Sequence, residues 1–141
     1  MIRFQRLSPH IYVLIFERFL YIGETQREPP ARWAEHFGRN GSFVNALERV
    51  GVTEKDLISD TFIAEAFSCP GILELDKVLR KAATQEVEDI LHRKVRTSKS
   101  LYSFRIISNT IKTAPREPVW SGSEELADVI LLELENSLRS F

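Results

Sequence analysis

The sequence predicts an α+β fold in which helices flank a small three-stranded antiparallel sheet, with a further strand and helix added at the C-terminal end. Two short apolar runs near the N-terminus are separated by only two polar residues, which is typical of a β-hairpin. A third run alternates between apolar and polar residues, as a half-buried strand does. Apolar residues recur at helical spacing in the second half of the chain, so helices should cover the sheet.

The hairpin should consist of strands over residues 10–16 and 19–22. Both segments are rich in apolar and β-branched residues, and the Glu17-Arg18 step between them is short enough for a tight turn. Gly23 is expected to end the second strand, because glycine weakens a strand interior.

Short helices and a third strand should follow the hairpin. Helices are predicted over residues 32–37, 42–50 and 53–57, the second of them capped by Ser42. Residues 60–67 alternate well enough for a strand, which completes the three-stranded antiparallel sheet.

The rest of the chain should contain a long helix, a fourth strand and a closing helix. The long helix is expected over residues 72–95, with an interruption near residues 83–85 left open. A strand over residues 101–107, a loop over 114–118 and an amphipathic helix over 123–138 should follow.

Composition excludes several classes of protein. The chain has 141 residues, of which 43% are hydrophobic, so one compact domain is expected. Its longest apolar stretch, residues 11–16, is too short to cross a bilayer, and the N-terminus lacks the apolar region of a signal peptide. We therefore expect a soluble cytoplasmic protein with no membrane partner. The single Cys69 excludes an internal disulfide and a zinc finger, and is expected to be a buried apolar side chain.

Charge is unevenly distributed although the net charge is only −1. Residues 93–116 contain seven basic residues and no acidic one, whereas residues 117–141 contain six acidic residues and one arginine. This distribution predicts a basic surface followed by an acidic helix. Ordinary solvated faces on both elements are the alternative.

Three short motifs near the N-terminus form a spaced set. They are a His-Ile-Tyr tripeptide ending at Tyr12, a Tyr-Ile-Gly tripeptide ending at Gly23, and an Arg-Trp-x-x-His motif from Arg32 to His36. Eight residues separate the two tripeptides. This set resembles the signature of the GIY-YIG nuclease family, in which two strands carry the tripeptides and a helix follows.

The resemblance implies a metal-dependent endonuclease that uses one divalent ion, Mg²⁺ or Mn²⁺, held by a glutamate on a later helix. Glu88 fits this position best, with Glu86 as the alternative. The two lie about 200° apart around a helix, so only one of them can face the site. The match covers residues 8–95 of a single domain over 1–141 and leaves residues 96–141 as a C-terminal extension.

The resemblance also implies roles for the remaining site residues. Tyr12 resembles the general base that deprotonates the attacking water, which requires nearby positive charge to lower its pKa from about 10. Arg32 would clamp phosphate oxygens with its planar guanidinium. Tyr21 would orient the water or the phosphate, and His36 would hydrogen-bond or relay a proton. Gly23 would let the backbone approach the substrate.

DNA is the partner that the nuclease resemblance implies. The basic segment should contact its phosphates without reading sequence, through Arg93, Lys94, Arg96 and Lys99. Tyr102 and Phe104 lie two apart on one strand face and would either stack on bases or pack in the core.

Two departures from the family pattern leave other classes of function open. His10 stands where the family usually has glycine, and Asn109 is the only asparagine near the place where one often follows the glutamate helix. A nucleic-acid-binding module that has the same fold but no catalytic activity is the first alternative. An interaction protein that uses the leucine-rich last helix, which would also support a homodimer, is the second.

Overall fold

The computed structural model describes residues 8–27, 29–37, 41–59, 62–109 and 117–139. It confirms the α+β class and contains one four-stranded sheet in the order β3-β1-β2-β4. The strands are β1 (His10–Phe16), β2 (Phe19–Thr25), β3 (Phe62–Ser68) and β4 (Arg105–Ile106). β1 is antiparallel to both β2 and β3, whereas β4 runs parallel to β2. The sheet is therefore mixed, and the three antiparallel strands are only part of it.

The hairpin of β1 and β2 determines which residues face each other. The turn is two residues long, and Glu17 has a φ of 50°, a conformation that tight hairpin turns require. The resulting register pairs Tyr12 with Gly23 and Leu14 with Tyr21. β2 continues to Thr25, so Gly23 lies inside the strand and does not end it as predicted.

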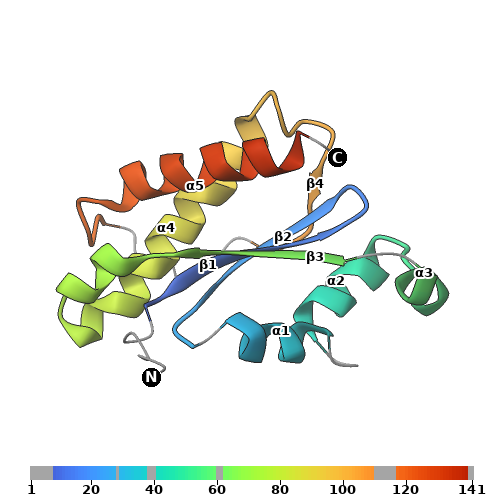
Figure 1. Ribbon diagram of the computed structural model, residues 1–141, viewed down its shortest axis with the longest axis horizontal. Coiled ribbons are helices and arrows are strands. Elements are labelled where there is room, and N and C mark those ends of the chain that lie inside the picture. Colours follow the sequence, from blue (N-terminus) through green and yellow to red (C-terminus); the bar gives the residue numbers. More distant parts are fainter. Residues whose placement is uncertain (1–7, 28, 38–40, 60–61, 110–116, 140–141) are drawn as a thin grey trace, which may run out of the picture.

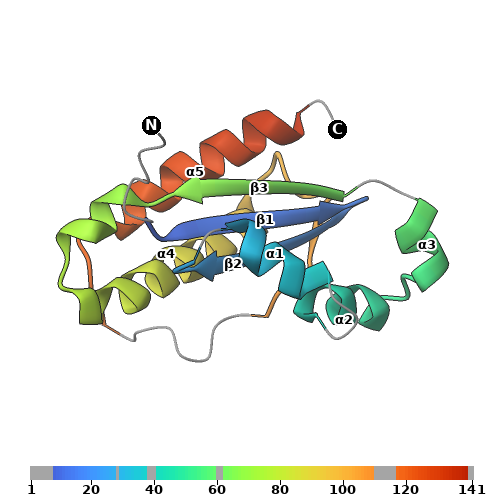
Figure 2. The ribbon, with the colours of Figure 1, turned by 60° about the horizontal axis from the view of Figure 1, so that its bottom comes forward.

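Helices cover both faces of the sheet (Figure 1). They are α1 (Pro29–Phe37), α2 (Ser42–Arg49), α3 (Glu54–Ser59), α4 (Lys77–Thr97) and α5 (Ser123–Leu138), with a 3₁₀ turn, η1 (Pro70–Glu74), before α4. Figures 1 and 2 place α4 and α5 on one face and α1 and α2 on the other. Because β1 lies between these two layers, its residues 11–16 are all buried, which explains its nearly continuous apolar sequence.

The two faces of β1 belong to separate apolar clusters. Ile11 and Val13 pack with Val87 of α4, whereas Tyr12 and Leu14 lie in the cluster on the α1 and α2 side. Alternation along a strand sends successive side chains to opposite faces. Tyr12 therefore faces α1, and the residues beside it in the chain face α4.

Several predicted boundaries differ from the structure. Gly41 is the N-cap of α2, so Ser42 begins the helix instead of capping it. α4 is continuous through residues 83–85, where Ala83 and Thr84 are buried. The Thr84 hydroxyl donates to the Arg80 carbonyl at 2.7 Å, so it is hydrogen-bonded within the helix.

The C-terminal part of the chain also differs from its prediction. The predicted strand over residues 101–107 is reduced to the two residues of β4. Most of the predicted loop over 114–118, and the start of the predicted strand over 60–67, lie outside the described residues. None of the helices in the described segments is long and apolar enough to cross a membrane.

Glu86 of α4 anchors the beginning of α5. Its carboxylate accepts hydrogen bonds from the backbone N–H groups of Val119 and Trp120, at 2.7 and 3.3 Å, and from the Ser123 hydroxyl. These groups lie at the N-terminal end of a helix, where N–H donors lack partners inside the helix. Glu86 is thus engaged in holding α5 on α4, and Glu88 is the carboxylate left to face the other side.

We expect Glu86→Ala to lower the free energy of unfolding by about 1–3 kcal/mol, because two backbone donors lose their acceptor. Urea unfolding followed by circular dichroism measures this change. Glu133→Ala is the matched control, since Glu133 is exposed in the middle of α5. Equal stability of the two variants would show that the contacts of Glu86 do not hold α5.

Candidate active site

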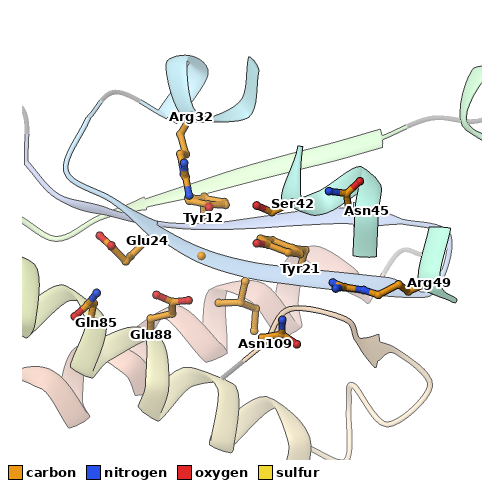
Figure 3. A pocket seen from close by; sticks show the side chains of 12 residues that line it. Tyr12, Tyr21, Glu24, Arg32, Ser42, Asn45, Arg49, Gln85, Glu88 and Asn109 are labelled. Carbon is orange, nitrogen blue, oxygen red and sulfur yellow. The ribbon is translucent and has the colours of Figure 1, made fainter. Parts of the chain in front are cut away.

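A pocket of about 390 Å³ lies at the edge of β2 that faces away from β1. β4 pairs only with Phe19 and Leu20, and the Ile22 N–H donates to the Ser108 hydroxyl, so within the described part of the chain the open edge of β2 begins after Ile22. Figure 3 shows tyrosine and arginine side chains on the α1 side of β2 and carboxylates on its α4 side. The lining residues are Tyr12, Tyr21, Ile22, Gly23, Glu24, Arg32, Ser42, Asn45, Arg49, Gln85, Glu88 and Asn109. The pocket therefore joins the two faces of the sheet around one strand.

Gly23 makes room for Tyr12 in this pocket. A Cβ atom built on Gly23 would overlap the ring and hydroxyl of Tyr12, which lies opposite it in the register. Any side chain at residue 23 would thus displace the tyrosine. The sequence prediction gave Gly23 a role toward the substrate, whereas its contact in the structure is with Tyr12.

The Tyr12 hydroxyl lies between two side chains of α1. It is hydrogen-bonded to Nε2 of His36 and to the guanidinium of Arg32. Burial raises the pKa of Tyr12 above its ordinary value, and the neighbouring Tyr21 adds to this effect, while Arg32 acts in the opposite direction. The motif resemblance had instead implied a lowered pKa for Tyr12. In the protein alone the cost of burying a phenolate outweighs the effect of one arginine, so Tyr12 carries its proton at neutral pH.

His36 is placed to exchange a proton with Tyr12. It is 1% exposed, and burial together with the positive charge of Arg32 lowers its pKa to about 4. The imidazole is therefore neutral, and its Nδ1 has no partner among the described residues. With the proton on Nδ1, Nε2 accepts the hydrogen bond that the Tyr12 hydroxyl donates.

Arg32 is partly buried and reaches the pocket from the same face of α1 as His36. One of its nitrogens donates to Glu35 at 2.7 Å, and the guanidinium also meets Tyr12. Glu35 binds Arg27 as well, at 2.6 Å. These contacts hold the guanidinium at the pocket entrance, where Figure 3 shows it directed at Tyr12.

Glu88 enters the same pocket from α4. It is 5% exposed, and among the described residues no group donates a hydrogen bond to its carboxylate. Burial raises its pKa to about 9, with further increases from the charges of Glu24 and Asp89 and a decrease from Arg32. The negative charge of Glu88 also contributes to the raised pKa values of Tyr12 and Tyr21. The predicted set of Tyr12, Tyr21, Arg32 and Glu88 is thus gathered around one cavity.

The residues around Glu88 suit a magnesium-like ion. A buried carboxylate without a donor is a costly arrangement, and an oxygen-binding cation relieves it. No group of three or more His, Cys, Asp or Glu side chains in the described segments gathers at metal-binding distance. Mg²⁺ needs few protein ligands because it keeps several of its waters. Glu88 could hold such an ion together with water and other residues that line the pocket. The described residues do not form the set of ligands that zinc requires.

The structure adds residues that the sequence analysis did not select. Glu24, Asn45 and Arg49 line the pocket, and the charge of Arg49 acts on Tyr21. Strand alternation would have placed Glu24 on the face covered by α4, together with Leu20 and Ile22. Nothing in the spacing of α2 indicates that its polar side chains reach across to β2.

Asn109 lines the pocket although it lies far from Glu88 in the chain. A buried hydrogen-bond chain holds the segment before it in place. Ser108 Oγ accepts from the backbone N–H of Ile22 at 3.0 Å and is hydrogen-bonded to His92 Nε2 at 2.7 Å. The other ring nitrogen, Nδ1, donates to the Glu88 carbonyl at 3.0 Å. Since His92 has a lowered pKa owing to burial, it is neutral, and Ser108 is the donor to Nε2.

The four basic residues predicted to bind substrate do not line the pocket. Lys94 forms ion pairs of 2.7 Å with Glu124 and Asp128 of α5, and Arg93 pairs with Asp89 at 3.3 Å. Arg96 borders a separate groove near the end of α4, and Lys99 is exposed beyond that helix.

The other side chains singled out in the sequence lie near β4 and β3, and they differ in their exposure to solvent. Tyr102 is exposed beside the groove that Arg96 borders. Phe104 packs on the core, with Arg18 over its ring at 5.0 Å. Cys69 is fully buried, as predicted, and takes no part in the pocket.

Comparisons with known proteins give no match. No family model fits the chain, and no curated protein or solved structure matches it.

Glu88 should make the stability of the metal-free protein depend on pH. Its pKa is about 9 in the folded protein, against 4.5 ordinarily, so between these values the folded state holds a proton that the unfolded state has lost. The free energy of unfolding should therefore fall as pH rises from 6.5 to 9, by at most about 1.4 kcal/mol per unit. Below pH 6.5 the depressed pKa of His36 acts in the opposite direction.

Urea unfolding in EDTA across this pH range tests the prediction, with Glu88→Gln as the comparison. The variant has no proton to lose, so its profile should be flatter than that of the wild type. Parallel profiles would mean that Glu88 is not the group that titrates.

Proposed function

We propose that the chain is a metal-dependent endonuclease that hydrolyses DNA phosphodiester bonds and that residues 8–95 form a GIY-YIG-like catalytic core. The observation that carries the proposal is the convergence of four side chains in one pocket: Tyr12, Tyr21, Arg32 and Glu88. They come from two strands and two helices, and they are the residues to which the motif resemblance assigns roles in a nuclease.

Phosphodiester hydrolysis needs positive charge around the phosphate, because negative charge grows on its oxygens during attack. Arg32 supplies a planar set of donors at the entrance of the pocket and would bind phosphate oxygens there. A divalent ion such as Mg²⁺ or Mn²⁺, held by Glu88, supplies Lewis-acid stabilisation when bound. The two sources of charge lie on opposite sides of β2, so a phosphate at its open edge would be held from both faces.

Tyr12 and His36 together provide the base in this proposal. As the Tyr12 hydroxyl passes its proton to His36 Nε2, the tyrosine oxygen takes a proton from the attacking water. The resulting hydroxide forms a bond to phosphorus while the bond between phosphorus and the leaving oxygen breaks. The leaving oxygen takes a proton from solvent. This assignment is supported by the Tyr12–His36 hydrogen bond. His36 is neutral, and the negative charge of a bound phosphate would raise its lowered pKa and make it a better proton acceptor.

Tyr21 and its neighbours would position the substrate. The Tyr21 hydroxyl is hydrogen-bonded to Ser42, and its ring packs edge-on against His36 with 5.0 Å between ring centroids. Arg49 lies on the same side and offers a second guanidinium for an adjacent phosphate.

The proposal also covers DNA contacts outside the pocket, the cellular location and the oligomeric state. Arg93, Arg96 and Lys99 would make only peripheral contacts with longer DNA. A cytoplasmic location and a homodimer through α5 are the further expectations. Val129 and Leu132 of α5 are 48% and 58% exposed, which leaves apolar surface for such a contact.

We expect the purified protein to nick supercoiled plasmid in Mg²⁺ or Mn²⁺ and to lose this activity in EDTA. Tyr12→Phe and Glu88→Gln should each lower the rate by at least about a hundredfold, because they remove the base and the ion's carboxylate. Gel electrophoresis of the nicked product over time measures the rate. Glu133→Gln, an exposed change on α5, should cut at the wild-type rate.

Nicking that persists in EDTA, or that survives Glu88→Gln, would contradict the proposed chemistry. Absence of nicking with salt-dependent DNA binding would instead support the binding module without catalytic activity. A self-associating protein that neither cuts nor binds DNA would support the interaction protein.

A further inference from the structure

We propose that Glu24 provides a second carboxylate for the divalent cation, so that the ion lies between β2 and α4 and not on Glu88 alone. This inference rests on the metal site of the proposed function, but it does not depend on cleavage activity.

The position of Glu24 in β2 brings its side chain to the α4 side of the sheet. It pairs with Ile11 in the register, next to the Tyr12–Gly23 pair, and strand alternation turns it away from the tyrosines. Glu24 and Glu88 both line the pocket, and Figure 3 shows both on the α4 side of β2. One carboxylate thus comes from the sheet and the other from the helix that covers it.

Glu88 is the independent sign of a cation at this place. Only 5% of its surface is exposed, and it lines the cavity. Among the described residues, no group donates a hydrogen bond to its carboxylate. A buried carboxylate next to another is unfavourable unless one is protonated or a cation lies between them. Glu24 and Glu88 line the same cavity from neighbouring elements, and the negative charge of Glu24 contributes to the raised pKa of Glu88.

Gln26 holds Glu24 near α4. Its side-chain nitrogen donates to Glu24 Oε2 at 3.2 Å and to the Thr84 hydroxyl of α4 at 3.0 Å. This bridge uses one carboxylate oxygen and fixes the end of β2 against the helix that carries Glu88. The other oxygen of Glu24 has no hydrogen bond within the described part of the chain and is left to bind a cation or one of its waters.

Titration of the full-length, metal-free protein with Mn²⁺ by isothermal calorimetry tests the proposal. We expect one site in the wild type, at least about tenfold weaker binding in Glu24→Gln, and a larger loss in Glu88→Gln. Glu133→Gln is the control and should bind Mn²⁺ as the wild type does. Gln keeps the size and shape of Glu, and circular dichroism of each variant verifies that it is folded.

The outcomes separate this inference from the nuclease proposal. Wild-type affinity in Glu24→Gln, with affinity lost in Glu88→Gln, would overturn the role of Glu24 and leave the nuclease proposal standing. A wild-type protein that binds no Mn²⁺ would overturn both. Weaker Mn²⁺ binding in Glu24→Gln supports the second carboxylate even if plasmid is not cut.

Discussion

The pairing of Tyr12 with Gly23 is the constraint on which the rest of the site depends. The hairpin turn sets the register, and the register places a large buried ring opposite the one residue in β2 that leaves space for it. From that position the tyrosine hydroxyl reaches His36 and Arg32 of α1. Glu88 enters the same pocket from the other face of the sheet, so a single strand, β2, lies between Tyr12 and Glu88.

Electrostatics make this arrangement dependent on positive charge. Tyr12 and Glu88 both have raised pKa values because they are buried, and Arg32 offsets only part of this effect. The pocket of the protein alone therefore holds protons that a divalent cation would displace. A phosphate would bring further negative charge, which Arg32 and Arg49 are placed to meet. The chemistry we propose therefore depends on the cation and the phosphate as well as on the residues of the pocket.

The sequence was sufficient for the parts of the fold that depend on local patterns. Apolar alternation and the two-residue turn predicted the hairpin, and helical spacing predicted α4 and α5. The local patterns did not predict two features of the structure. α4 continues through Ala83 and Thr84, which are buried, and β4 has only two residues.

In the site, the motif identified Tyr12, Tyr21, Arg32 and Glu88, all of which line the pocket. Long-range packing added Arg49 and Asn109, since α2 and the segment after β4 come together only in three dimensions. The same packing brings Lys94 into ion pairs with α5, and the number of basic residues in the segment did not predict these pairs.

The central claim is that both faces of the sheet meet at one cation site on the open edge of β2. Paramagnetic broadening of backbone NMR signals by substoichiometric Mn²⁺ tests it most directly, because the effect depends on distance from the ion. We predict that the amide signals of Gly23, Glu24 and Glu88 broaden first, while those of the acidic helix α5 remain sharp. Broadening that begins in α5 and spares Gly23 and Glu88 would contradict the account.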